Sequence, residues 1–266
     1  MKGIKEMIKA IIFDLDDTLL WDEKSVKEAF KATCEIAQER YNVDADKLEE
    51  LVRRNARELY SSYETYPFTQ MIGINPFEGL WGTFHDEGEG FQKMKKMAPD
   101  YQRDAWTKGL KDAGIDNPEF GKELAEAFPE KRKENAFLYD DTLKVLDALK
   151  ENYTLLLLTN GSPELQHIKL DISPEIPPYF DHIVISGGFG KGKPDPSIFE
   201  HALELLNVEK EQVLMVGDNL HTDILGANRT GIPSVWLNRK KQEQHEEIVA
   251  TYEITSLSEL QTILNK

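Results

Sequence analysis

Short apolar runs alternate with amphipathic stretches along most of the chain. Five runs are apolar on both alternating faces, as is typical of strands buried in a parallel sheet. They lie at 8–14, 153–159, 182–186, 213–217 and 234–237, with a weaker run at 252–255. The amphipathic stretches lie at 142–151, 163–170, 196–206, 222–228 and 257–264. Strands that alternate with helices predict an α/β fold with a doubly wound parallel sheet. Asp141 and Ser256 precede two of these helices as expected N-caps.

The interval from 21 to 136 breaks this rhythm. Helical periodicity at 24–41, 46–60 and 118–128 flanks an aromatic-rich, glycine-interrupted stretch between Tyr60 and Trp106. A helical insertion directly after the first strand predicts a cap domain. We therefore expect a core domain from 1–20 and 137–266 and a helical cap from 21–136, with hinges at 20–22 and 129–137. The aromatic side chains are expected to form the core of the cap rather than a ligand cage.

Composition narrows the class of protein. The 266 residues include 48 acidic and 32 basic ones, a net charge of −16. Nucleic-acid binding needs a basic face, so we expect no nucleic-acid partner. The chain has no apolar run long enough for a membrane span, and the apolar run at 8–13 is too short for a signal peptide. One cysteine, Cys34, excludes an intrachain disulfide. We expect a cytoplasmic protein that does not bind membranes.

Acidic residues crowd the end of the first apolar run. Asp14, Asp16 and Asp17 place three carboxylates within four residues. Like charges repel and burial penalises each of them, and a cation would offset both costs. Asp218 ends a second apolar run, and Asp223 lies about one helical turn later. Parallel strands would bring Asp14, Asp16 and Asp218 around one hard cation, for which oxygen ligands indicate Mg²⁺. Asp223 alone is equally explained as a first-turn acid favoured by the helix dipole.

Two further loops have the residues of an anion site. The turn from Thr159 to Ser162 offers a hydroxyl, backbone N–H groups and a helix N-terminus. Taken alone, it is better explained as a capped turn with Ser162 as N-cap and Pro163 at the first helical position, and only the other motifs reverse this interpretation. Lys193 stands in a proline-stiffened loop, although a lone loop lysine is usually a solvated charge. The spacing from Gly187 to Lys193 imitates a nucleotide-binding P-loop, but Pro194 replaces the required Ser or Thr.

Taken in order, four motifs resemble those of the haloacid dehalogenase (HAD) superfamily of hydrolases. They are D-x-D-D-T-L from Asp14, T-N-G-S from Thr159, K-P-D-P from Lys193 and V-G-D-N-x-x-T-D-I from Val216. They span nearly all of the expected core and are together highly specific. The insertion after Leu20 resembles the helical cap that one branch of the superfamily carries between its first and second motifs. Resemblance is weakest within the cap, where substrate selection is expected.

The resemblance implies a role for each motif residue. Asp14 would be the nucleophile that forms an aspartyl phosphate, and Asp16 the general acid and then the general base. Mg²⁺ would be held by the carboxylates of Asp14 and Asp218 and by the backbone carbonyl of Asp16. Asn219 and Asp223 would hold the waters or the ligands of the metal.

The same resemblance assigns the phosphate-binding groups. Thr159, the Asn160 N–H and Lys193 would bind the phosphoryl oxygens and stabilise their charge, with Lys191 as a substitute for Lys193. Basic residues 131–133 near the return hinge would contact a charged substrate group or form a solvated helix face.

Asp16 favours one reaction over its relatives. Dehalogenases of the superfamily lack this second acid, because a halide leaves without a proton whereas an alkoxide needs one. We therefore expect a Mg²⁺-dependent phosphatase acting on a small phosphorylated metabolite. A phosphomutase, a non-catalytic phospho-ligand binding protein on the same scaffold and a dehalogenase stay as alternatives. Asp17 stands where mutases and many relatives have glycine.

Overall fold

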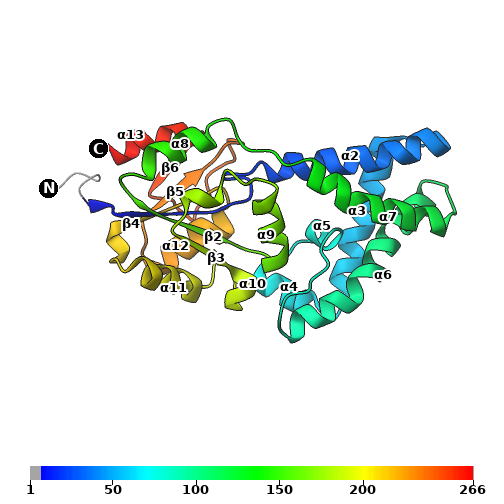
Figure 1. Ribbon diagram of the computed structural model, residues 1–266, viewed down its shortest axis with the longest axis horizontal. Helices are drawn as coiled ribbons and strands as arrows, with labels where there is room; N and C mark the ends of the chain where they lie inside the picture. The colour runs from blue at the N-terminus through cyan, green and yellow to red at the C-terminus, as the bar shows by residue number, and fades with distance from the viewer. Residues whose placement is uncertain (1–6, 266) are drawn as a thin grey trace. The chain divides into compact units, whose positions relative to one another are not determined.

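The computed structural model describes residues 7–265, and the chain divides into two compact units (Figure 1). Unit 1 contains the chain up to Trp21, residues 138–161 and the residues from 173 onward. Unit 2 contains residues 22–137 and 162–172. Each unit has its own core and is described by itself.

Unit 1 is built on six parallel strands in the order β3-β2-β1-β4-β5-β6. The strands are β1 (Ala10–Phe13), β2 (Thr154–Thr159), β3 (His182–Ile185), β4 (Val213–Gly217), β5 (Ser234–Leu237) and β6 (Tyr252–Ile254). The central strand β1 is buried on both faces, and its Ile12 pairs with Leu156 on one side and Met215 on the other. The sheet confirms the predicted doubly wound α/β fold, including the weaker run that forms β6.

Helices lie on both faces of this sheet. Figure 1 shows α8 (Thr142–Leu149) and α13 (Leu260–Leu264) on one side, with α11 (Pro196–Leu206) and α12 (Leu225–Thr230) on the other. Ile12 packs in one cluster with Ile198 and Phe199 of α11. Shorter helical segments are α10 (Ser186–Phe189), three 3-10 turns (Pro177–Tyr179, Lys210–Gln212 and Leu257–Glu259) and one π-helical turn (Leu220–Ile224).

One of the two expected N-caps is correct and the other is wrong. Ser256 accepts a hydrogen bond from the N–H of Ser258 and completes a capping box with Glu259. Asp141 makes no side-chain bond to its own helix α8. Its carboxylate instead accepts from the N–H of Leu257 and forms an ion pair with Arg239.

Unit 2 is entirely helical among its described elements. They are α2 (Asp22–Tyr41), α3 (Ala45–Ser62), α4 (Tyr66–Ile72), α5 (Pro76–Gly79), α6 (Glu89–Asp112), α7 (Pro118–Glu134) and α9 (Pro163–Asp171). Its core includes Tyr60, Phe84 and Trp106, each at most 1% exposed. The aromatic side chains therefore pack as core, as expected. Across the described residues, no helix combines the length and the hydropathy that a membrane span needs.

The long helix α6 was not predicted. The glycines in this stretch, including Gly88 and Gly90, suggested an irregular segment, since glycine weakens helices. The buried residues Phe91, Met94, Ala98, Tyr101 and Ala105 nevertheless recur every three or four positions. Burial of this stripe in the unit 2 core outweighs the cost of Pro99 inside the helix.

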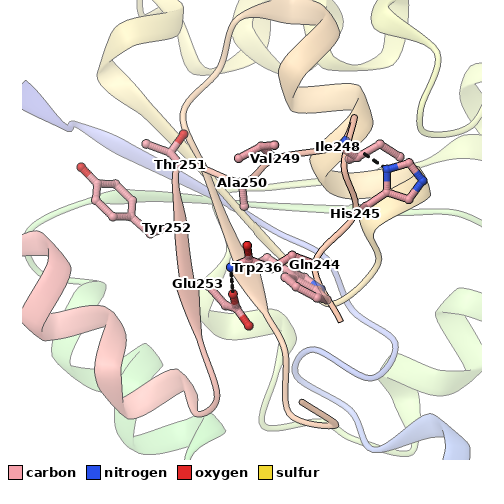
Figure 2. A pocket seen from close by; sticks show the side chains of 9 residues that line it. All are labelled: Trp236, Gln244, His245, Ile248, Val249, Ala250, Thr251, Tyr252 and Glu253. Carbon is pink, nitrogen blue, oxygen red and sulfur yellow. Dashed lines mark hydrogen bonds between the residues drawn. The ribbon is translucent and has the colours of Figure 1, made fainter. Parts of the chain in front are cut away.

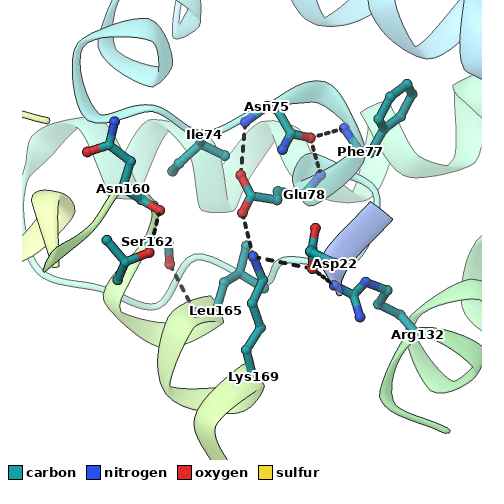
Figure 3. A network of polar contacts seen from close by, with 12 residues as sticks. Asp22, Ile74, Asn75, Phe77, Glu78, Arg132, Asn160, Ser162, Leu165 and Lys169 are labelled. Carbon is teal, nitrogen blue, oxygen red and sulfur yellow. Dashed lines mark hydrogen bonds and ion pairs between the residues drawn. The ribbon is translucent and has the colours of Figure 1, made fainter. Parts of the chain in front are cut away.

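Four charged side chains form a buried network in unit 2 (Figure 3). Lys169 of α9 places its Nζ 2.9 Å from Oε1 of Glu78 and 3.7 Å from Oδ1 of Asp22. Arg132 pairs with the same Asp22 carboxylate. None of the four side chains is more than 13% exposed. Burial opposes ionisation of Asp22, but Lys169 and Arg132 outweigh it and lower its pKa.

The network links α9 to the helices of the inserted segment. Lys169 lies in the segment 162–172, which groups with unit 2 although it follows β2 of unit 1 in the chain. The predicted domains had left this segment in the core. The predicted limits, 1–20 with 137–266 and 21–136, stay a prediction.

Of the basic residues 131–133, Arg132 is buried in the network, while Lys131 and Lys133 pair with glutamates on the surface of α7.

Candidate functional site

Three carboxylates meet at the carboxyl end of the sheet in unit 1. Asp14 follows β1 and Asp218 follows β4, and these two strands are parallel neighbours. Asp223 lies in the π-helical turn after β4. One oxygen of each carboxylate lies within 4.8 Å of the others. Asp14 is 8% exposed and Asp223 is fully buried, so both carboxylates have lost most of their hydration.

The cluster shifts the ionisation of its own members. Burial raises the pKa of Asp14 to about 6, although the ammonium of Lys193 opposes the shift. Burial, with repulsion from Asp14 and Asp223, raises the pKa of Asp218 to about 9. Three carboxylates held this close together, two of them buried, favour a bound cation. A hard divalent cation with oxygen ligands fits this donor set, since carboxylate and carbonyl oxygens are what Mg²⁺ prefers.

Lys193 pairs with two carboxylates of this cluster. Its side chain is 1% exposed, with Nζ 2.6 Å from Oδ1 of Asp14 and 2.7 Å from Oδ1 of Asp223. Burial alone would lower the pKa of Lys193, but Asp14 and Asp223 outweigh it and raise the pKa. The ammonium therefore stays charged beside Asp14. Lys191, the expected substitute, is 54% exposed and pairs with Asp195 instead.

Asn160 holds the backbone of Lys193 through both ends of its side-chain amide. Its Nδ2 donates to the Lys193 carbonyl at 2.9 Å, and its Oδ1 accepts from the Lys193 N–H at 2.8 Å. A side chain at Gly192 would clash with this amide, because a Cβ there would lie 2.8 Å from Asn160 Oδ1. The sequence interpretation gave Asn160 only a backbone role. Thr159, at the end of β2, is 1% exposed.

Thr18 is a site residue that the sequence interpretation missed. Its hydroxyl donates to Oδ2 of Asp14 at 3.1 Å and accepts from the N–H of Asp218 at 3.1 Å. Thr18 is fully buried. Thus Lys193 contacts one oxygen of Asp14 and Thr18 contacts the other. The sequence did contain a signal for this role, because Thr18 is the threonine of the first motif, four residues after Asp14.

The other predicted residues lie around this centre. Asp16 is half-buried and is not one of the three clustered carboxylates. Asp17 has a φ of 59°, a left-handed conformation that Asp tolerates better than most residues, which explains why it replaces a glycine. Asn219 donates its N–H to Oδ2 of Asp223. Asp223, expected beside the metal's ligands, lies within the carboxylate cluster itself.

A second pocket lies beside β5 and β6 (Figure 2). Its volume is about 220 Å³, and its lining includes Trp236, Gln244, His245 and Glu253. The polar groups bond to one another: Gln244 donates to Glu253, and His245 Nδ1 accepts from two backbone N–H groups. Its clearest link to the carboxylate cluster is the Trp236 Nε1–H, which donates to the Asp218 carbonyl at 2.8 Å. We therefore read this pocket as support for the Asp218 loop.

Comparison with known proteins decides the family. A sequence model of the haloacid dehalogenase-like hydrolase family matches residues 8–231. The chain belongs to the haloacid dehalogenase-like hydrolases. This haloacid dehalogenase-like chain is 31% identical to the phosphoserine phosphatase of Thermus thermophilus over 253 residues, 95% of this chain and 98% of that protein. It is 30% identical to the glyceraldehyde 3-phosphate phosphatase of Pyrococcus abyssi, over 88% of this chain and 83% of that protein.

The fold comparison agrees with the family. The HAD hydrolase YfnB of Bacillus subtilis, solved bound to magnesium, superposes with a TM-score of 0.67 and 24% identity over 97% of this chain and 99% of that one. At that identity the likeness shows the fold. The predicted HAD resemblance is thus confirmed for both the family and the fold.

Proposed function

We propose that this haloacid dehalogenase-like hydrolase cleaves a small phosphoric monoester through an aspartyl phosphate on Asp14. The observation that carries the proposal is the setting of Asp14. Its two oxygens contact Lys193 and Thr18, and two more carboxylates lie within 4.8 Å. Binding alone needs no carboxylate held in this way beside a buried cation, whereas a nucleophile does.

The nucleophile and the acid have distinct tasks. Asp14 attacks phosphorus, the bond to the leaving oxygen breaks, and a proton from Asp16 neutralises the departing alkoxide. Asp16, then a carboxylate, takes a proton from the water that attacks the phosphorus of the aspartyl phosphate. That attack releases phosphate and restores Asp14. Thr159, the Asn160 N–H and Lys193 bind the phosphoryl oxygens, and Lys193 stabilises the charge that they carry.

Mg²⁺ is the cofactor that suits this donor set. The carboxylates of Asp14 and Asp218 and the carbonyl of Asp16 would hold it, with Asn219 and Asp223 orienting its waters or ligands. When bound, Mg²⁺ supplies positive charge next to the phosphoryl oxygens. The acidic surface of the chain repels an anionic substrate, so this local charge, together with Lys193, is needed for binding.

The substrate class follows from the relatives. The two curated relatives described above are phosphatases of phosphoserine and of glyceraldehyde 3-phosphate. Both names indicate small phosphorylated metabolites, and we propose a substrate of that class for this chain. Asp16 separates this reaction from dehalogenation, since a halide leaves without needing a proton. Release of free phosphate would also separate it from a phosphomutase, which returns the phosphoryl group to a substrate.

The test is hydrolysis of p-nitrophenyl phosphate with Mg²⁺ and with EDTA, beside halide release from 2-chloropropionate. We expect Mg²⁺-dependent phosphate release that is lost in Asp14→Asn. Asp46→Asn is the matched control, because Asp46 is an exposed carboxylate in the first turn of α3. No phosphate release from folded protein, or halide release instead, would overturn the proposal.

A further inference from the structure

Arg239 lies two residues beyond β5 and contacts three parts of unit 1. Its Nη2 donates to Oδ1 of Asp141 at 2.9 Å, and its Nη1 lies 3.3 Å from Oδ2. Nη2 also reaches the carbonyl of Thr18 at 3.4 Å. The guanidinium lies over the ring of Tyr139, 3.8 Å from its centroid. None of the four HAD motifs includes Arg239.

Asp141 is a fixed anchor for this arginine. Besides Arg239, its Oδ2 accepts from the Ser256 hydroxyl and the Leu257 N–H, each at 2.8 Å. Burial opposes ionisation of Asp141, but the hydrogen bonds from Arg239 and Ser256 outweigh it and lower its pKa. The carboxylate therefore stays charged at neutral pH and holds the guanidinium in one orientation.

Tyr139 connects Arg239 to the residues of unit 1 that flank the inserted segment 22–137. Tyr139 stacks on Trp21, with centroids 5.1 Å apart and an angle of 17°. Leu20 and Leu138 form an antiparallel bridge beside this stack. Arg239, Tyr139 and Trp21 thus form a layered stack within unit 1, close to the two points where the chain leaves and re-enters this unit. Such stacking suits a planar guanidinium better than an ammonium.

Thr18 connects this stack to the nucleophile. Its carbonyl faces Arg239, while its hydroxyl contacts Asp14 Oδ2 and the Asp218 N–H. The intervening turn is tight, because Leu19 and Leu20 both donate their N–H groups to the Leu15 carbonyl. A shift of the Thr18 carbonyl would therefore move the hydroxyl that holds Asp14.

We propose that Arg239 is a positioning residue that fixes the turn after Asp14, so that the Thr18 hydroxyl holds the nucleophile. The proposal rests on the proposed function for its effect on turnover, but not for its effect on the turn. A lysine would keep the charge beside Asp141. It would lose the fork that reaches Asp141 and Thr18 together, and also the stacking on Tyr139.

The test compares Arg239→Gln and Arg239→Lys with Arg40→Gln, an exposed arginine paired with Glu123. Hydrogen exchange measured by mass spectrometry reads the turn directly. We expect the amides of residues 19 and 20 to exchange at least about tenfold faster in Arg239→Gln, and at the wild-type rate in Arg40→Gln. Unchanged exchange in this turn would overturn the proposal whether or not the protein hydrolyses phosphate esters.

Kinetics separates positioning from simple support of the fold. In folded Arg239→Gln, we expect kcat for p-nitrophenyl phosphate to fall about tenfold to a hundredfold with little change in KM, and less in Arg239→Lys. Combined with Thr18→Val, the loss should not multiply, since Arg239 acts through Thr18. A loosened turn with normal kcat, or multiplying losses, would contradict a positioning role. An inactive wild type would count against the proposed function, and hydrogen exchange would still decide the role of Arg239.

Discussion

Lys169→Met removes one cation from the buried network of unit 2, and its cost tests how that network is held. Lys169 is 2% exposed and Glu78 is 6% exposed, with 2.9 Å between Nζ and Oε1. The substitution keeps most of the length of the side chain but removes the ammonium that pairs with Glu78. Removing one member of a buried pair costs about 3–5 kcal/mol in the free energy of unfolding, because the remaining buried charge loses the ammonium that offset its desolvation.

Lys131→Met is the matched control. Lys131 makes a pair of nearly the same length, 2.8 Å to Glu134, but the two side chains are 32% and 59% exposed. An exposed pair contributes about 0–1 kcal/mol. The double variant Lys169→Met/Glu78→Gln should be more stable than Lys169→Met alone, since it also removes the buried negative charge of Glu78. Glutamine can still complete the capping box with Asn75.

Urea unfolding measures these free energies, with hydrogen exchange over α5 and α9 to locate the loss in unit 2. Equal costs for Lys169→Met and Lys131→Met would refute the reasoning. So would a double variant less stable than Lys169→Met, because the cost would then come from lost packing rather than from the buried negative charge of Glu78.

Three further predictions concern charge and packing. The pKa of Asp22 is lowered from its ordinary value near 3.8, so its contribution to stability is present above that value and is lost as pH falls through the lowered pKa. The urea midpoint of unit 2 should therefore fall as pH drops below about 4, and fall less in Asp22→Asn. Mg²⁺ should bind more weakly as pH falls from about 9 to about 6, because protons compete with the metal for Asp218 and then for Asp14. Calorimetry in two buffers should detect the protons that Mg²⁺ binding releases, and a pH-independent affinity would contradict this prediction. Gly217→Ala would place a Cβ 2.2 Å from Asp223 Oδ2, so we expect at least a tenfold loss of kcat and a destabilisation of about 1–3 kcal/mol, measured by turnover and urea unfolding.

Most of the sheet could be predicted because its signals are local. β1 is an apolar run that ends just before Asp14, and β4 is an apolar run that ends just before Asp218. Parallel pairing then brings their carboxyl ends together without further information. The place of Asp223 was harder to predict, because the π-helical turn that carries it into the cluster leaves no simple pattern in the sequence.

Residues that act through tertiary contacts could not be predicted. Asn160 holds Lys193 across 33 positions of the chain, and Arg239 reaches Thr18 across 221. Neither contact has a spacing that a single sequence displays. Helix α6 was missed for another reason: Gly88 and Gly90 are local signals against a helix, and burial of the whole stripe outweighs them.

The central claim is that Asp14 carries the phosphoryl group. Its most direct test is acid quenching of Asp16→Asn during hydrolysis of p-nitrophenyl phosphate labelled with ³²P, followed by peptide mapping. Nitrophenolate leaves without protonation, so the intermediate should form in this variant and accumulate for want of the base that activates water. We predict stoichiometric label on the peptide containing Asp14, lost on hydroxylamine treatment and absent in Asp14→Asn. Phosphate release by the wild type with no protein-bound label in Asp16→Asn would contradict the mechanism.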